Sequence, residues 1–527
     1  MSVDPRASRI GLQVLRSGGN AVDAAVATFL ALAVTHPQAG NLGGGGFMLV
    51  RMADGSTSAI DFREVAPAVA HRDLYLRPDG TVDPERSLVG ATAAAVPGSP
   101  AGLVTALRLH GTRTLNELAR PAIELARDGF EVDCFLAAAL AEERQLLGRF
   151  ASTRRVFFVE DRPLRAGERL VQADLAATLE RYAEAGFDGF YRGRTAALVT
   201  AQMQRDGGYI TNEDLAGYAA KERTALRGTY RGHEVICMPP PSSGGVALLQ
   251  MLNILEPYDL GGSGFGGSTT VHLMIEAMKR AYADRARWLG DADHVPVPVE
   301  GLVSKGYADE LRRSLRTDAA TEVAPGRPPG AKEGEHTTHF SVVDAAGNAV
   351  SCTTTINSTF GCGLVVDGAG FLLNNEMDDF AAQPGVPNQF GLIGGAANAI
   401  GAGKRPLSSM TPAIVCKDGK LRLVLGSPGG GRIINTVLQV LLNVVDHGMP
   451  LDQAVRAPRI HHQWRPASLQ WEWNSLVPDV RARLDGMGHR FAARPRSIGQ
   501  CQAIAVDGNG LRTGVADPRS SGSAVAY

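Results

Sequence analysis

Three pairs of alternating segments in the C-terminal third most constrain what this chain can fold into. Each pair places apolar and polar residues in turn on both sides of a turn rich in Asp, Gly or Asn: HFSVVDAAGNAVSCTTTI, PAIVCKDGKLRLVLGS and CQAIAVDGNGLRTGVA. Alternation with a period of two is typical of strands that bury one face, and such turns close antiparallel hairpins. A similar pair, FMLVRMADG followed by STSAIDF, lies near the N-terminus. The sequence therefore predicts antiparallel sheets.

The N-terminal two thirds is mainly helical in pattern. Apolar residues recur at helical spacing over 6–16, 21–34, 114–127, 136–147, 173–185, 195–205, 246–255 and 270–289. Two further helices are predicted after hairpins in the C-terminal third, over 433–445 and 477–484. Helices that flank antiparallel hairpins favour a layered α+β sandwich.

A segment rich in proline and glycine separates the two parts. It covers residues 317–336, TDAATEVAPGRPPGAKEGEH, and five of the six residues from Pro325 to Gly330 are Pro or Gly, which predicts a loop. One interpretation is an ordinary domain linker. The other is a processing loop, because the segment runs directly into Thr337 at the start of a predicted strand, where a cut would leave a threonine at the end of a buried sheet.

Length and composition exclude several classes of protein. A chain of 527 residues exceeds what one core usually supports, so two domains or one large multilayer domain are expected. With 20% charged residues and a net charge of −1, nothing favours nucleic acid or an anionic membrane as a partner. No apolar run is long enough to span a membrane. The opening MSVDPRASRI lacks the pattern of a signal peptide, although an upstream segment is not excluded.

Other motifs that often carry chemistry are weak or missing here. The six cysteines show no CxxC spacing, which argues against a zinc site and a dense disulfide framework. The glycine runs Gly43–Gly46 and Gly429–Gly431 lack phosphate-binding spacing, so close packing or exposed backbone amides are the better interpretation. GxSxG and HExxH do not occur. His461 and His462 are adjacent, which favours a surface or supporting role over metal binding.

A series of motifs instead occurs in one order along nearly the whole chain. They are GNAVDAAVA, THPQAGN, NLGGGGFM, IDFREVAPA, VPGSPAGL and MPPPSSGG, then TTHFSVVDAAGNAVSCTTTINSTFG, LLNNEMDDF, PGVPNQFGLIGG, KRPLSSMTP, GSPGGGR and the closing DPRS. Any one of them fits a strand with its turns. Together they resemble the large and small subunits of the γ-glutamyltranspeptidase family. The resemblance implies a four-layer αββα sandwich of the N-terminal-nucleophile hydrolase type.

The resemblance also implies that the chain cuts itself between His336 and Thr337. The products would be residues 1–336 and 337–527, which stay associated because their strands share sheets. A threonine hydroxyl needs an adjacent base, and a free α-amine, with a pKa near ~8, serves once the preceding peptide bond is cut. Thr337 would then be both the processing residue and the nucleophile. Thr355 is similar to the family threonine that hydrogen-bonds the nucleophile, although its pattern alone favours an ordinary strand residue.

The same resemblance assigns the other residues of the site. Gly429 and Gly430 match the pair whose backbone N–H groups bind the oxyanion. Two sets match the contacts to a γ-glutamyl group: Arg63, Ser408 and Ser409 to its α-carboxylate, and Asn357, Glu376 and Asp379 to its α-ammonium. Without the resemblance, Arg63 would be read as a surface ion-pair residue, and Asp378 with Asp379 as solvated acids.

One position departs from the common family pattern. The segment PGVPNQFGLIGG is similar to the lid that covers the substrate in many members, where an aromatic position is commonly tyrosine. Here it is Phe390, which lacks the hydroxyl that could hydrogen-bond to Asn357. The family pattern therefore does not predict how this lid moves, or whether water or an amine is the preferred acceptor.

The implied reaction is a ping-pong acyl transfer that requires no metal or organic cofactor. A γ-glutamyl group passes from glutathione or a related compound through Thr337 to water, an amino acid or a dipeptide. One alternative is a cephalosporin or glutaryl acylase of the same superfamily, which has no α-ammonium to bind. Another is an inactive, uncleaved paralogue with a binding or structural role. Family members are usually periplasmic or secreted, but this sequence also leaves the cytoplasm open.

Overall fold

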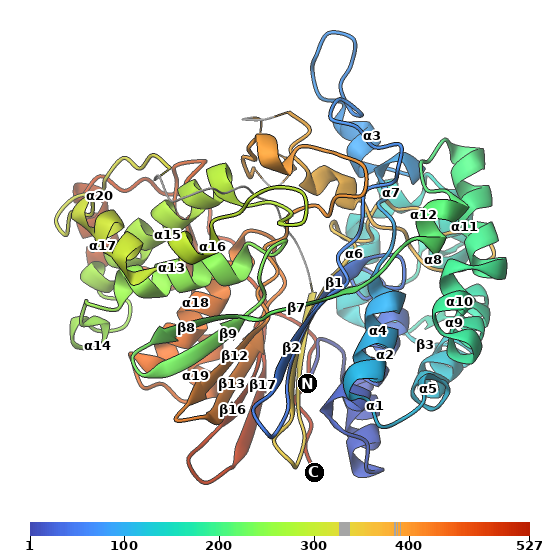
Figure 1. Cartoon of the computed structure of the whole chain (residues 1–527), viewed down its shortest axis with the longest axis horizontal. Coiled ribbons are helices and arrows are strands. Elements are labelled where there is room, and N and C mark those ends of the chain that lie inside the picture. Colours follow the sequence, from blue (N-terminus) through green and yellow to red (C-terminus); the bar gives the residue numbers. More distant parts are fainter. Residues whose placement is uncertain (326–337, 384–385, 387, 390) are drawn as a thin grey trace.

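The computed structural model describes residues 1–325, 338–383, 386, 388–389 and 391–527. Two antiparallel sheets face each other at its centre, and helices cover the outer side of each sheet (Figure 1). Apolar side chains of both sheets, among them Phe47, Ile236 and Ile414, fill the space between them. The predicted four-layer αββα sandwich is confirmed.

The first sheet combines strands from both ends of the sequence. In spatial order it contains β10 (Thr338–Val343), β11 (Ala349–Thr355), β1 (Gly45–Arg51), β2 (Thr57–Asp61) and β7 (Lys221–Arg223). The core on its outer side is formed with α1 (Pro5–Arg16), α2 (Ala21–Thr35), α4 (Ser99–His110), α5 (Leu115–Asp128), α9 (Ala173–Ala185), α10 (Phe187–Tyr191) and α11 (Gly193–Asp206). Every residue of α2 is buried, as expected for a helix that is apolar on all sides.

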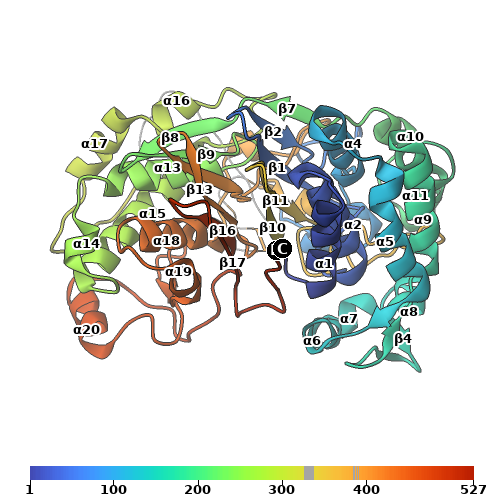
Figure 2. The ribbon, with the colours of Figure 1, turned by 90° about the horizontal axis from the view of Figure 1, so that it is seen from below.

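The second sheet has six strands. Its order is β17 (Arg512–Ala516), β16 (Gln502–Val506), β13 (Lys420–Gly426), β12 (Ala413–Lys417), β9 (His233–Cys237) and β8 (Leu226–Tyr230). The helices that form the core on its outer side include α13 (Gly244–Leu255), α15 (Ser268–Trp288), α18 (Arg432–Val445), α19 (Leu451–Arg456) and α20 (Pro478–Gly486). Figure 2 shows this helical layer on the side of the molecule away from α1 and α2.

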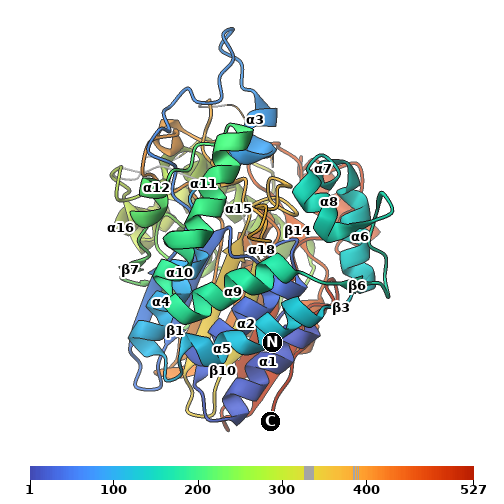
Figure 3. The ribbon, with the colours of Figure 1, turned by 90° about the vertical axis from the view of Figure 1, so that its right-hand side faces the viewer.

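Shorter elements complete the chain. The helices are α3 (Pro84–Leu88), α6 (Cys134–Glu142), α7 (Arg144–Leu147), α8 (Ala151–Phe157), α12 (Asn212–Ala216), α14 (Leu260–Ser263), α16 (Val299–Leu302), α17 (Lys305–Arg313) and the 3-10 turns η1 (Ala91–Ala93), η2 (Glu376–Asp379) and η3 (Ala396–Asn398). Three two-stranded ribbons pair β3 (Phe130–Glu131) with β6 (Arg169–Leu170), β4 (Phe158–Val159) with β5 (Arg162–Pro163), and β14 (Ile460–His461) with β15 (Gln470–Trp471). Figure 3 shows α6, α7 and α8 set to one side of the first helical layer.

The predicted hairpins all form. β1 pairs with β2 around Gly55, whose φ of 90° suits glycine, and β10–β11, β12–β13 and β16–β17 are the three C-terminal hairpins. The predicted helices are also confirmed, with one correction. The segment 136–147 is two helices, because the backbone of Glu143, at ψ 16°, leaves the helical range between α6 and α7.

Each sheet draws strands from both sides of the proline- and glycine-rich segment. In the first sheet β11 lies between β10 and β1, with a seven-residue register from Gly45↔Thr355 to Arg51↔Ala349. In the second, β12 lies between β13 and β9. The two parts of the chain therefore share one hydrogen-bonded framework. The proposed boundary at His336–Thr337 falls outside the described residues and stays a prediction.

The close approach of β1 and β11 gives a stability prediction. A Cβ on Gly46 would overlap the carbonyl oxygen of Thr353, whereas a Cβ on Gly306 of α17 would meet nothing. Gly46→Ala should lower stability by about 2 kcal/mol or more, since the sheet must shift to accept it, and Gly306→Ala should stay within ~0.5 kcal/mol of wild type. Thermal unfolding of the two variants checks this, and equal melting temperatures would contradict the packing described for β1.

Candidate active site

The ends of several central strands meet at one edge of the sandwich. The register pairs the start of β10, Thr338, with Thr354, so the end of β11 and the start of β1 lie at the same edge. β2 runs back toward this edge and ends at Asp61, just before Arg63. Residues that are distant in the sequence are thereby brought together at this edge.

The predicted nucleophile and cleavage site, Thr337 and His336, lie outside the described residues, as does Phe390. The first residue described after that gap, Thr338, is buried, and its Oγ1 has no hydrogen-bond partner among the described residues. Thr355 is buried at the end of β11, where its Oγ1 accepts the backbone N–H of Asn357 at 2.7 Å.

Asn357 occupies the turn that follows β11. Its φ of 71° is left-handed, a conformation that asparagine tolerates better than most residues. The side-chain nitrogen donates to Asn375 O at 2.9 Å, which leaves the amide oxygen without a partner in the described part of the chain. An unfilled acceptor therefore lies close to Thr355.

Arg63 is fully buried, so its interpretation as a surface ion-pair residue is wrong. Its Nη1 lies 2.7 Å from Glu376 Oε2, and its Nη2 lies 2.6 Å from Asp379 Oδ2. Its Nε donates to Pro406 O at 3.0 Å. The fork of one guanidinium thus joins η2 to the loop that carries Ser408 and Ser409. Asp378 and Asp379 are also buried rather than solvated, because η2 packs inside the molecule.

A third carboxylate, Glu64, shares the same guanidinium, with Oε2 3.3 Å from Arg63 Nη1. Burial raises the pKa of Glu64 and of Glu376 well above the ordinary value. Burial works against the charge of Arg63, but Glu376, Glu64 and Asp379 outweigh it, so the pKa of Arg63 lies above its ordinary value. Glu64 Oε1 and Glu376 Oε1 have no hydrogen-bond partner among the described residues. Three buried carboxyl groups share one guanidinium, so the charge of a second cation could be balanced in the same cluster.

Ser408 and Ser409 are fully buried in a loop before β12. Ser243 donates to Ser408 O from both its backbone nitrogen, at 2.6 Å, and its hydroxyl, at 2.8 Å. The hydroxyls of Ser243 and Ser409 are 3.5 Å apart, and Arg285 Nε donates to Ser243 Oγ at 3.0 Å. Ser243 and Arg285 therefore position the serine pair. Ser243 lies in the motif MPPPSSGG, which the sequence analysis matched to the family without assigning a role to this serine.

Gly429 and Gly430 connect β13 to α18 with φ values of 126° and 63°. Both lie in the region that favours glycine, and in the described part of the chain neither N–H donates a hydrogen bond to another group. They precede the N-terminus of a 14-residue helix, where the aligned peptide dipoles favour negative charge. Gly429 is half-buried and Gly430 is buried, so among the described residues their amides are unpaired rather than exposed, whereas Gly43–Gly46 are close-packed against neighbouring backbone and side chains.

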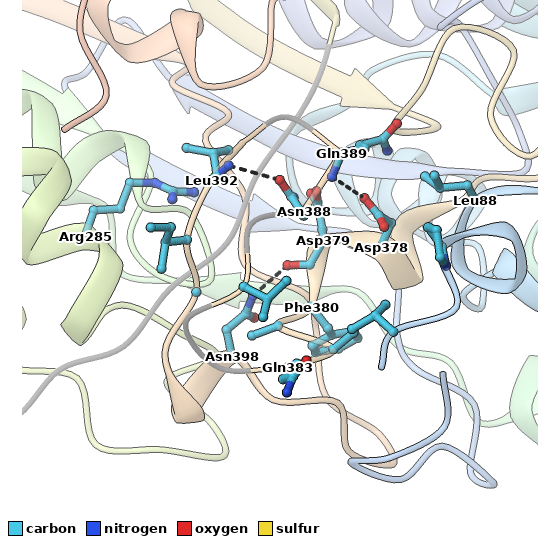
Figure 4. A pocket seen from close by; sticks show the side chains of 17 residues that line it. Leu88, Arg285, Asp378, Asp379, Phe380, Gln383, Asn388, Gln389, Leu392 and Asn398 are labelled. Carbon is cyan, nitrogen blue, oxygen red and sulfur yellow. Dashed lines mark hydrogen bonds between the residues drawn. The ribbon is translucent and has the colours of Figure 1, made fainter. Parts of the chain in front are cut away.

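A cavity of about 300 Å³ lies beside η2. Figure 4 shows Asp378 and Asp379 on one side of it, with Arg285 pointing in from α15. Asp378 accepts from Ser87 Oγ at 3.0 Å and from Gln389 N at 3.4 Å. Burial raises the pKa of Asp378 to about 6. The described residues of the proposed lid segment line the cavity next to the carboxylate cluster.

His461 and His462 are both buried, so a surface role is wrong for this pair. His461 is hydrogen-bonded to Asn435 at 2.8 Å and to Gln463 at 2.9 Å, and His462 Nδ1 accepts the backbone N–H of Trp464. Both rings support the turn between β14 and β15.

Similarity to known proteins extends over nearly the whole chain. The family model described as Gamma-glutamyltranspeptidase matches residues 7–527. The chain is 50% identical over 523 residues to the glutathione hydrolase proenzyme of Escherichia coli (strain K12), covering 98% of this chain and 90% of that protein.

Two solved structures resemble the fold. The cephalosporin acylase from Bacillus halodurans matches with a TM-score of 0.89 and 28% identity, covering 100% of this chain and 95% of its own. The γ-glutamyltranspeptidase of Helicobacter pylori matches with a TM-score of 0.61 and 44% identity, covering 62% of this chain and 95% of its own.

Within the described residues, no helix is both long and apolar enough to cross a membrane. This chain is an enzyme with the N-terminal-nucleophile hydrolase fold, and it belongs to the γ-glutamyltranspeptidase family.

Proposed function

We propose that this enzyme is a self-processing γ-glutamyltransferase and glutathione hydrolase that uses Thr337 as its nucleophile. The observation that carries the proposal is the buried cluster of Arg63 with Glu64, Glu376 and Asp379 at the edge where β11 ends. Buried acceptors without partners are costly, and a ligand that supplies the missing donors is strongly favoured.

The γ-glutamyl head group has the charges that complement this cluster. Its α-ammonium would donate to Glu376, Asp379 and Asn357 Oδ1. Its α-carboxylate would bind Arg63, Ser408 and Ser409. Because Arg63 is paired with Glu376 and Asp379, the ammonium would take over part of that pairing and leave the guanidinium for the carboxylate.

Self-cleavage would create the catalyst. Thr337 Oγ attacks the carbonyl carbon of His336, the peptide C–N bond breaks, and the released nitrogen takes a proton to become an α-amine. Water then hydrolyses the ester, which leaves a carboxylate on His336 and a free hydroxyl on Thr337. Since Thr337 is bonded to Thr338, the first residue of buried β10, the new N-terminus would be held at the proposed site.

Turnover would use the same hydroxyl. The α-amine of Thr337 removes its proton, the oxygen attacks the γ-carbonyl carbon, and the N–H groups of Gly429 and Gly430 stabilise the oxyanion. Cysteinylglycine or another amine leaves with a proton and the acyl group remains on Thr337. Water, an amino acid or a dipeptide then takes it. Thr355 would orient the hydroxyl from the end of β11.

The carboxylate cluster also helps to judge the alternative function, that of an acylase. This alternative is relevant because the fold is similar to that of the Bacillus halodurans cephalosporin acylase. A glutaryl side chain has no α-ammonium. Its binding would leave Glu376 and Glu64 buried with unfilled acceptors next to a second carboxylate. Charge complementarity therefore favours γ-glutamyl donors.

After cleavage the two chains would stay together, because strands of both alternate in each sheet. For the compartment we propose the periplasm or the exterior of the cell, on the family resemblance alone.

Processing gives the first prediction for this function. Purified wild-type protein should run as two chains of 336 and 191 residues, by subtraction from 527 at the His336–Thr337 bond. Thr337→Ala should remain one chain, and Thr337→Ser, which keeps a hydroxyl, should be cut more slowly. Denaturing gels with mass spectrometry read this out. A full-length protein with full activity would rule out the mechanism, whereas an inactive full-length protein would support the uncleaved paralogue.

Substrate recognition gives the second prediction for this function. Arg63→Lys keeps the charge but loses the fork, so the KM for glutathione should rise about tenfold or more while self-cleavage continues. Arg162→Lys is the matched control, because Arg162 forms a bidentate pair with Glu168 near the surface. If the KM is the same for both variants, another group binds the α-carboxylate.

The proposed oxyanion donors give the third prediction for this function. Gly429→Ala should lower kcat by roughly 10²-fold or more, since a side chain at φ 126° displaces the N–H groups. Gly510→Ala carries a similar backbone strain at φ 85° in a remote turn and should leave kcat unchanged. Both proteins must first be shown to be fully cut. Equal kcat values would remove Gly429 from the oxyanion site.

A further inference from the structure

The last residues before the proposed cleavage segment are fastened to the molecule at several points. We call residues 316–323 the upstream segment. Ala320 N donates to Met487 O at 2.7 Å, and Trp464 Nε1 donates to Val323 O at 2.8 Å. Both partners belong to the part of the chain that follows Thr337. The upstream segment is thus attached to what would become the other processed chain.

Glu276 of α15 makes the strongest of these attachments. It is completely buried, with Oε1 2.6 Å from Lys279 Nζ and Oε2 2.7 Å from Arg280 Nη1. Burial opposes the charge of Glu276, but hydrogen bonds and charges from Lys279, Thr321 and Arg280 outweigh it and lower the pKa of Glu276 to about 2. The carboxylate is therefore ionised at neutral pH.

Thr321 is where these charged groups converge on the upstream segment. Its backbone N–H donates to Glu276 Oε1 at 3.3 Å and its hydroxyl donates to Glu276 Oε2. Arg280 Nη2 donates to Thr321 Oγ1 at 3.1 Å, and Lys279 donates to Thr321 O. One residue thus receives four contacts from a single turn of α15, and the ones to the ionised carboxylate are charge-assisted.

Two histidines add a further contact. His272 Nε2 lies 2.6 Å from Arg316 O, so it must donate, and His272 Nδ1 lies 2.7 Å from His489 Nε2. Burial lowers the pKa of His489 to about 4, which keeps that ring neutral. Although His272, Glu276 and His489 are close enough to bind a metal ion, these hydrogen bonds and the adjacent Lys279 and Arg280 argue against one.

These contacts fix one end of the segment that leads to the scissile bond, and β10 fixes the other. Residues 324–337 connect Val323 to Thr338. Holding both ends of a connection restricts the conformations open to it, which would favour the geometry in which Thr337 Oγ reaches the carbonyl carbon of His336. We propose that Glu276 and Thr321 are positioning residues for self-cleavage, which they accelerate without taking part in later turnover. This proposal rests on the self-processing function above.

The structure separates this attachment from substrate binding. Among the described residues, the hydrogen-bond and ion-pair partners of Glu276 are Lys279, Arg280 and Thr321, and none of them is a proposed site residue. Once the peptide bond is cut, the upstream segment only holds the tail that ends at His336. The rate of cleavage should therefore respond to Thr321, and the kinetics of the cut enzyme should not.

The test compares Thr321→Val with Thr321→Ser. Valine has the shape of threonine without the hydroxyl, whereas serine keeps the hydroxyl, and both keep the backbone N–H. Full-length chains made by cell-free synthesis are sampled over time on denaturing gels. The half-life of uncut Thr321→Val should be about fivefold longer than that of wild type, and Thr321→Ser should lie within about twofold.

The cut proteins provide the control. Their kcat/KM for γ-glutamyl-p-nitroanilide should match that of wild type, a result that a general structural role for Thr321 in the site would not give. Cleavage of Thr321→Val at the wild-type rate, or a parallel fall in kcat/KM after cleavage, would overturn the proposal. A wild-type chain that stays uncut would instead overturn the proposed function itself.

Discussion

The pairing of one buried guanidinium with several buried carboxylates is the interaction on which the candidate site depends. Arg63 joins Glu376 and Asp379 of η2 to the backbone of the loop that carries Ser408 and Ser409. Ion pairs in the interior gain little net stability, since desolvation offsets the attraction. Their retention here is therefore better explained by ligand recognition, because the excess of carboxylates and the unfilled acceptors suit a zwitterionic head group.

The double sheet makes such a site compatible with a cut in the chain. β11 lies between β10 and β1, so strands from both sides of the processing segment hold each other in register. The hydrogen bonds that join the described strands all lie outside residues 326–337, so a cut between His336 and Thr337 would break none of them. The new N-terminus would stay attached to β10, and the helix after Gly430 would keep its backbone N–H groups directed at the same place.

The parts of the fold that follow from local chemistry were predicted well from the sequence. The hairpins depend on alternation and on turns such as that at Gly55, which neighbouring residues determine. The burial of Arg63 was missed because Glu376 and Asp379, two of its partners, lie more than 300 residues away along the chain. Ser243 and Arg285 were missed for the same reason, because their contacts to each other and to the loop of Ser408 form only when distant segments pack. Glu64 is next to Arg63 in the sequence, and it was missed with the burial of that residue. Family motifs indicated the candidate site, whereas the charge balance within it required the structure.

The central claim is that Thr337 becomes a free N-terminus and carries the γ-glutamyl group. The most direct measurement is peptide mapping by mass spectrometry after the purified enzyme has been mixed briefly with a γ-glutamyl donor and quenched in acid. We expect the peptide beginning at Thr337 to be heavier by one γ-glutamyl group, attached to the threonine. A γ-glutamyl group on any other residue, or a Thr337 still bonded to His336 in active protein, would contradict it.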